Sequence, residues 1–109
     1  FHPRGHGTVA RVIEQFVIAD QAFNLEEAVK KMTSMPASVL GLSNRGSIAP
    51  SKVADLVIFD PSKVKETATF ARPHQLAKGF DWVLIDGEVA RREGVSLPER
   101  HGRVLRPNP

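Results

Sequence analysis

Two histidines near the start of the chain, His2 and His6, have a spacing that could serve chemistry. Histidines four residues apart bind one metal ion when both rings lie on the same face of a helix. Pro3, Gly5 and Gly7 surround these histidines and argue against a helix at this point. We therefore interpret His2 and His6 as loop histidines rather than as metal ligands.

The segment 5–8 lies just before an expected helix and contains two glycines. Unpaired N–H groups and the helix dipole favour anions at such a position. The segment lacks a third glycine and the Lys-Ser/Thr pair of phosphate-binding loops, so the signal for a phosphate site is weak.

Asp55 and Asp60 flank an apolar segment, and paired carboxylates can act as general acid and base. On a strand, five residues span roughly 16 Å, which is too far for that chemistry. We interpret both as strand-end caps and turn residues. His74 and Gln75 could line a pocket, although a loop histidine beside a proline is more often simply exposed.

Nucleophilic acyl transfer has no candidate residue, because the sequence contains no Gly-x-Ser-x-Gly motif and no cysteine.

The length of 109 residues and the hydrophobic content of 41% indicate one globular domain at most. The net charge is +3, but the basic residues are scattered and tyrosine is absent, which disfavours nucleic-acid binding. We find no membrane span or signal peptide in the sequence, and we expect a cytoplasmic location.

Three helices are predicted before residue 42. Apolar residues at helical spacing predict a first helix over 8–20, with its first residue as N-cap. The second is expected over 24–34, where the first residue and Glu27 resemble a capping box. A short third helix is expected over 36–40, ended by Gly41 in a left-handed conformation.

Strands are expected in the second half of the chain. The apolar run Leu56–Phe59 predicts a strand buried on both faces, and a shorter strand is expected around Ile48. Ser51 follows Pro50, and because serine disfavours positive φ we expect a type I turn there.

Asp86-Gly87 between two apolar segments predicts an antiparallel hairpin over 82–91. The tail from residue 93 is expected to be extended and to lie along the body through Val104 and Leu105.

The order of these motifs resembles the closing segment of the metal-dependent amidohydrolase superfamily, in particular the N-acyl-D-amino-acid deacylases (D-aminoacylases). The clearest motif is Gly-x-Ile-x-Pro-x-x-x-Ala-Asp-Leu-Val-x-x-Asp over 46–60. The other matching segments are 2–8, 25–34, 40–42, 68–75 and 83–87. The resemblance covers nearly the whole chain but only about the last fifth of such an enzyme, because a complete barrel needs many more residues.

The resemblance implies an α+β fold: the C-terminal helices of a truncated TIM-barrel amidohydrolase, followed by part of a small β-sandwich. Residues 1–42 would be the helical remnant of the barrel rim. Residues 43–109 would be the β-sandwich portion with its extended tail.

The resemblance also implies a complete enzyme that hydrolyses the amide bond of N-acyl-D-amino acids, with zinc activating water and an aspartate acting as acid and base. The family's metal ligands and catalytic aspartate lie upstream of Phe1, so this chain alone is not expected to catalyse the reaction. Its partner would be the missing barrel portion or another copy of itself. The alternative is a non-catalytic structural or assembly module that associates through exposed sheet edges.

Two residues are implied to bind substrate. His2-Pro3-Arg4 would directly follow the last barrel strand, and loops after barrel strands lie at the catalytic face. The Arg4 guanidinium could hold the substrate carboxylate with two parallel hydrogen bonds, and His2 could be a further donor lining the pocket. The alternative for Arg4 is an ordinary loop arginine paired with a surface acid. His6 and Leu76 replace aromatic residues common in the family, which affects the expected substrate range.

A first prediction concerns metal binding by this chain. Because no three ligands have a workable spacing, the purified chain is expected to bind no stoichiometric zinc. Elemental analysis after dialysis measures this. About one tightly held zinc ion per chain would contradict the loop interpretation of His2 and His6.

Overall fold

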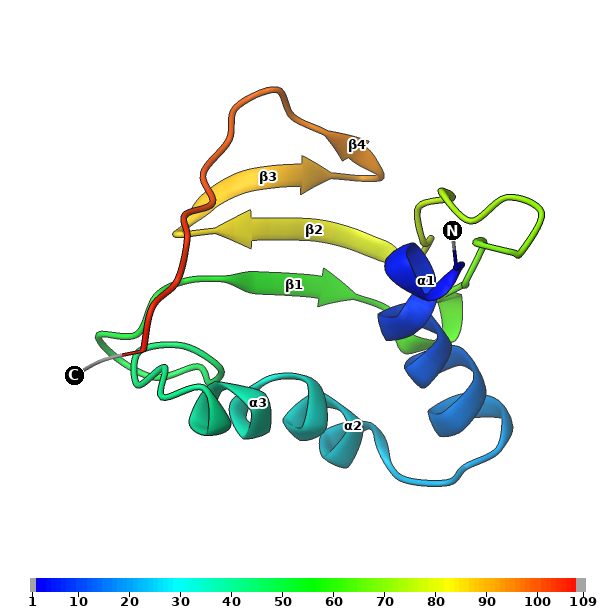
Figure 1. Ribbon diagram of the computed structural model, residues 1–109, viewed down its shortest axis with the longest axis horizontal. Coiled ribbons are helices and arrows are strands. Elements are labelled where there is room, and N and C mark those ends of the chain that lie inside the picture. The colour runs from blue at the N-terminus through cyan, green and yellow to red at the C-terminus, as the bar shows by residue number, and fades with distance from the viewer. Residues whose placement is uncertain (1, 108–109) are drawn as a thin grey trace.

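The computed structural model describes residues 2–107, which form a row of helices and one antiparallel sheet (Figure 1). This arrangement confirms the predicted α+β class. The elements are α1 (Arg4–Arg11), η1 (Val12–Ala19), α2 (Leu25–Met32), α3 (Ser34–Val39), β1 (Leu56–Phe59), η2 (Pro61–Lys63), β2 (Phe80–Ile85), β3 (Glu88–Arg92) and β4 (Val95–Ser96).

The first helix begins earlier than predicted, at Arg4 rather than after Thr8. Pro3 precedes the first turn with helical dihedral angles, and a proline has no N–H to leave unpaired there. His2 Nδ1 accepts the Arg4 N–H at 3.0 Å. The Thr8 hydroxyl does not cap the helix but donates to the Arg4 carbonyl at 2.7 Å. The predicted loop at His6 was wrong because Pro3 was counted with the two glycines against a helix, although a proline is well suited to a helix start.

The helix continues without a break into η1, which has the wider π-helical hydrogen bonding. At its end the Asp20 N–H donates to the Gln15 carbonyl at 2.7 Å. The predicted end near Asp20 is confirmed. The helix buries Ile13 and Val17, while Ile18 remains about half exposed.

The second and third helices follow closely on one another. The Asn24 side chain accepts the Glu27 N–H at 2.8 Å, which confirms the predicted cap of α2. Thr33 separates the two helices with non-helical dihedral angles. The third helix begins at Ser34, two residues before the predicted start, and Gly41 after it has φ +71° as expected.

The sheet has the order β1-β2-β3-β4 with every pair antiparallel. Asp86 and Gly87 have φ of 52° and 79°, the positive values of a type I′ hairpin turn, so the predicted hairpin is confirmed. A second positive-φ pair, Glu93-Gly94, turns the chain into β4. The extended-tail prediction missed this short strand because it did not use Gly94 as a turn signal.

The strand β1 is not buried on both faces, contrary to the prediction. Val57 and Ile58 are 50% and 55% exposed and, as neighbours on a strand, point to opposite faces. Within residues 2–107, β1 pairs only with β2 and is an edge strand. Leu56 and Phe59 are partly buried, so the four apolar residues in a row form a strand that is only partly covered by residues 2–107.

Two expectations before β1 were also wrong. Ile48 is 90% exposed and belongs to no strand. Ser51 has φ +67°, and the Lys52 N–H donates to the Ala49 carbonyl at 3.2 Å. These values fit a type II turn, so Ser51 adopts the conformation that its side chain disfavours.

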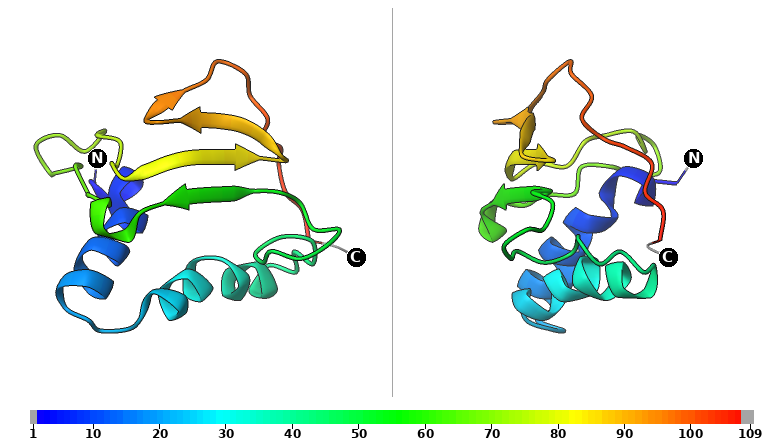
Figure 2. Two further views of the ribbon diagram at one scale, coloured as in Figure 1. Left: turned by 180° about the vertical axis from the view of Figure 1, so that it is seen from behind. Right: turned by 90° about the vertical axis from the view of Figure 1, so that its left-hand side faces the viewer.

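The core lies where the first helix meets the segment after η2. Ala10, Ile13 and Val64 are buried there, and Ile13 is the largest fully buried side chain among residues 2–107. Partly buried residues pack around them: Met32, Phe59, Ala77 and Phe80. Figure 2 shows the first helix against one end of the sheet, with α2 and α3 along its lower edge.

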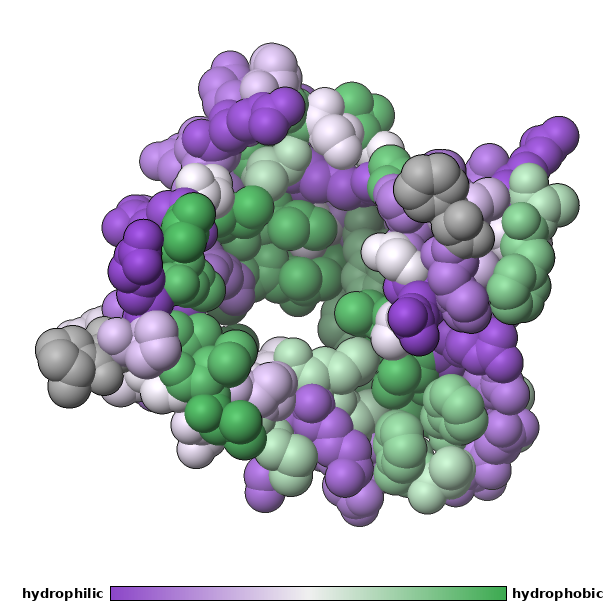
Figure 3. Space-filling model, in the orientation of Figure 1, coloured by the Kyte–Doolittle hydropathy of each residue, from purple (hydrophilic) through white to green (hydrophobic). Residues whose placement is uncertain are grey.

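The remaining contact between helices and sheet is loose. Figure 3 shows an opening between them, bordered by apolar residues. On the helical side, a hollow of about 590 Å³ is lined by residues that include Leu25, Val29 and Phe59. The tail crosses the other end, where Arg103 pairs with Asp86 at 2.6 Å. Leu105 lies beside β1 and β2 as expected, whereas Val104 is 83% exposed.

No helix among residues 2–107 has the length and apolar character that a membrane crossing requires.

The position of the core predicts unequal effects for two isoleucines of η1. Ile13→Ala should lower the free energy of unfolding by about 2–5 kcal/mol, because it leaves a cavity in the core. Ile18→Ala, at a half-exposed position of the same helix, should cost less than about 1 kcal/mol. Urea unfolding of the two variants measures the difference. Equal losses of unfolding free energy in the two variants would contradict this position of the core.

Candidate functional site

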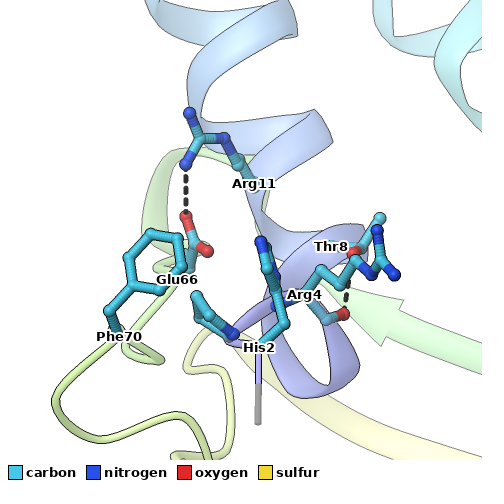
Figure 4. A pocket seen from close by; sticks show the side chains of 7 residues that line it. His2, Arg4, Thr8, Arg11, Glu66 and Phe70 are labelled. Carbon is cyan, nitrogen blue, oxygen red and sulfur yellow. Dashed lines mark hydrogen bonds and ion pairs between the residues drawn. The ribbon is translucent and has the colours of Figure 1, made fainter.

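A pocket of about 320 Å³ lies between the start of α1 and the segment after η2 (Figure 4). It brings together residues from two parts of the chain that are far apart in sequence. The lining residues are His2, Pro3, Arg4, Thr8, Arg11, Glu66 and Phe70. Both predicted substrate-binding residues therefore line one pocket.

Arg4 supplies a cation that no acid neutralises within residues 2–107. Its side chain is exposed, and no ion pair or side-chain hydrogen bond of its guanidinium occurs among these residues. Figure 4 shows the side chain extending beside Thr8, away from Glu66 and Phe70. The guanidinium is therefore accessible to a carboxylate ligand.

His2 is held by two contacts. Its Nδ1 accepts the Arg4 N–H at 3.0 Å, and its ring meets the Phe70 ring edge-on, with centroids 5.0 Å apart. Because Nδ1 is an acceptor, a neutral His2 ring carries its proton on Nε2. The Nε2–H group is thus the donor that His2 can offer to a ligand.

The second cation of the pocket, Arg11, is paired. Arg11 Nη1 lies 3.8 Å from Oε2 of Glu66, whose side chain is only 18% exposed. Glu66 also packs over Gly7, where a Cβ would come within 2.7 Å of its carboxylate. The glycine of the suspected anion loop thus permits close packing between the helix and Glu66.

The backbone beside Glu66 is tied to the same helix. Glu14 Oε2 accepts the Glu66 N–H at 2.7 Å, and the Lys65 ammonium lies 3.5 Å from Glu14 Oε1. Together with the Arg11 pair, these contacts fix the two walls of the pocket relative to each other.

The histidines do not assemble a metal site with the residues described. His6 lies within α1 and meets His74 edge-on at 5.3 Å, whereas His2 contacts Phe70. Among residues 2–107, no group of three or more histidine or carboxylate side chains could hold a metal ion. His74 is exposed, as expected for a loop histidine.

The two aspartates have the structural roles that the sequence indicated. Asp55 accepts the Asp86 N–H at 2.8 Å and pairs with Arg45. Asp60 caps η2: it accepts the Ser62 hydroxyl at 2.7 Å and the Ser62 N–H at 3.0 Å. These two hydrogen bonds, led by that of the hydroxyl, hold the pKa of Asp60 below its ordinary value.

Sequence reasoning did not single out Arg11, Glu66 or Phe70 as pocket residues. Each is a common residue type without a local motif of its own, and only the tertiary contact brings Phe70 to His2. Gly7 was the one available signal, since a glycine inside a helix often marks close packing.

Comparison with known proteins identifies the family to which this chain belongs. The sequence pattern described as "Amidohydrolase family" matches residues 2–91. The N-acyl-D-aspartate deacylase of Alcaligenes xylosoxydans xylosoxydans is 39% identical over 106 residues, which are 97% of this chain and 21% of that protein. The chain thus spans about a fifth of the length of this relative.

Solved structures agree. A crystal structure of D-aminoacylase superposes on 96% of this chain with a TM-score of 0.91 and 39% identity, and the chain covers 22% of it. The N-acyl-D-glutamate deacylase from Bordetella bronchiseptica, solved with zinc and a phosphonate inhibitor, gives a TM-score of 0.85, 37% identity and the same coverages. The chain therefore belongs to the amidohydrolase family.

Proposed function

We propose that this chain is the C-terminal part of a metal-dependent amidohydrolase that cleaves the amide bond of N-acyl-D-amino acids. The observation that carries the proposal is the match to D-aminoacylase over 96% of the chain in both sequence and structure. The chain covers only 22% of that protein, so the activity is proposed for the complete protein and not for this chain alone. A cytoplasmic location stays a prediction.

In this proposal, residues 1–42 belong to the rim of a barrel and residues 43–109 to a β-sandwich. The exposed apolar side chains of the first helix, such as Val9 and Ile18, would face the rest of the barrel. The single sheet with its open β1 edge would be one layer of the sandwich. The other layer would come from residues that precede this chain in the protein.

Arg4 is proposed to hold the substrate carboxylate. An N-acyl amino acid carries a carboxylate next to the scissile amide, and a guanidinium binds a carboxylate through two parallel hydrogen bonds. Such a grip orients the amide as well as adding affinity. The support for this role is that Arg4 has no acidic partner within residues 2–107 and lines the pocket with His2.

His2 is proposed to donate its Nε2–H to the bound substrate. The bond from the Arg4 N–H to Nδ1 sets the ring orientation and leaves Nε2 on the free side of the ring. The two residues would thus contact the same ligand from adjacent positions.

Zinc is proposed as the cofactor of the complete enzyme, because the Bordetella bronchiseptica relative was solved with zinc. Residues 2–107 do not fit a zinc site by themselves, since they lack a group of three ligands. We propose that the metal ligands and the acid–base aspartate lie in the preceding part of the protein, as the resemblance to the family implies. This chain's contribution would be to bind and orient substrate.

The alternative function is a non-catalytic assembly module that pairs through a sheet edge. The exposed β1 side chains Val57 and Ile58 favour it, because an open apolar edge strand readily pairs with another strand. In this alternative the partner is a second copy of the chain.

The Arg4 assignment predicts a selective loss in the full-length protein. Arg4→Lys keeps the charge but loses the two-pronged geometry, so kcat/KM for N-acyl-D-amino acids should fall about tenfold or more. Neutral amide analogues lack the carboxylate and should be nearly unaffected. Steady-state kinetics with the matched pair of substrates measures the contrast.

Arg72→Lys is the control, because it makes the same change on the exposed segment after η2 and outside the pocket. This variant should leave kcat/KM unchanged for both substrates. An equal loss for acids and neutral amides in Arg4→Lys would remove Arg4 from the binding site.

The alternative function predicts self-association through β1. The purified chain should then elute as a dimer, and Val57→Asp should convert it to a monomer by placing a charge at the paired edge. Val95→Asp, on the opposite edge strand β4, is the control and should leave the dimer intact. A parent chain that sediments as a monomer would rule this alternative out.

A further inference from the structure

The segment 65–78 forms a closed excursion that reaches from the sheet portion to the start of α1. Lys65 and Lys78 exchange two backbone hydrogen bonds of 3.0 Å, which close its base. At its outer turn, Thr69 and Arg72 exchange backbone hydrogen bonds of 3.0 and 3.1 Å. Figures 1 and 2 both show this excursion, in yellow-green, beside α1.

Phe70 lies on that outer turn and points into the pocket. Phe70 is 77% exposed. Its ring nevertheless contacts the His2 ring edge-on, with 5.0 Å between the ring centroids and 74° between the ring planes. Figure 4 shows Phe70 and Glu66 on one side of His2 and Arg4 on the other.

We propose that Phe70 is a positioning residue for Arg4, acting through His2. The chain of contacts is continuous: the Phe70 ring meets the His2 ring, and His2 Nδ1 accepts the Arg4 N–H. This inference rests on the proposed function, because it gives the excursion a part in binding the substrate carboxylate.

The physical reason is the freedom of an exposed histidine. Without the ring contact, His2 would rotate among side-chain conformations, and most of them do not direct Nδ1 at the Arg4 N–H. An edge-on aromatic pair raises the population of the contacting His2 conformation, relative to the others, by about 2- to 12-fold. The bond to Nδ1 then satisfies one of the free N–H groups of the first helical turn and fixes the backbone from which the guanidinium extends.

The first test compares substrates in the full-length protein. Phe70→Leu keeps an apolar side chain but removes the ring, and it should raise KM for N-acyl-D-amino acids about 2- to 10-fold with little change in kcat. KM for neutral amide analogues should rise less, because these analogues lack the carboxylate that Arg4 is proposed to hold. Phe70→Tyr restores the ring and should restore the parent KM.

Phe23→Leu is the matched control. It removes a ring from another aromatic pair, Phe16 and Phe23, with centroids 6.5 Å apart and outside the pocket. This variant should not change KM for either substrate. Equal increases of KM for acids and neutral amides in Phe70→Leu would overturn the positioning role.

A double variant tests whether Phe70 acts through Arg4. In the Arg4→Lys background, Phe70→Leu should add a smaller loss for acids than it causes in the parent protein, because only the His2 donor, and no longer the guanidinium, remains for it to position. A full additional loss would show that Phe70 acts on its own and would overturn the inference.

A second readout does not depend on activity. Nitrogen NMR of labelled full-length protein reports whether His2 Nδ1 accepts a hydrogen bond, and this signal should shift toward that of a free ring in Phe70→Leu and return in Phe70→Tyr. An unchanged His2 signal would overturn the proposal. If Arg4→Lys proves unselective while the His2 signal shifts, the carboxylate role of Arg4 fails but the contact chain stands.

Discussion

The packing of the first helix against the segment after η2 is the contact on which the rest of the structure depends. Ala10, Ile13 and Val64 form its apolar centre. Glu66 lies so close to Gly7 that a Cβ at this position would come within 2.7 Å of its carboxylate, so the Glu66 side chain would have to move. The same contact joins the helical part to the sheet, forms both walls of the pocket, and brings the excursion 65–78 to the first helical turn.

Local signals predicted those features of the fold that local physics decides. Asn24 caps a helix because its side chain accepts a backbone N–H three residues on, and Asp86-Gly87 turns a hairpin because both residues adopt positive φ. The helix start was missed because Pro3 was counted with the glycines against a helix, whereas it stands directly before the first turn. The burial of β1 was wrong for a different reason: a run of apolar residues does not show which segment covers it, and Val57 and Ile58 are half exposed among residues 2–107.

The residues of the candidate site also divide into those that the sequence could identify and those that it could not. Arg4 and His2 could be named from the sequence because they form part of a motif shared with a known family, and the structure places both in one pocket. Glu66 and Phe70 could not, because their contribution arises from a contact across some sixty residues of sequence. The boundary between a helical and a sheet portion near residue 42 stays a prediction, as does the second layer of the proposed sandwich.

Release of free D-amino acid from N-acyl-D-amino acids by the full-length protein, with the L-enantiomers as controls, tests the central claim most directly. We expect hydrolysis of the D substrates, loss of that activity on removal of metal, and recovery with zinc. Hydrolysis of the L substrates alone, or no hydrolysis of any N-acyl amino acid by the zinc-loaded protein, would contradict it.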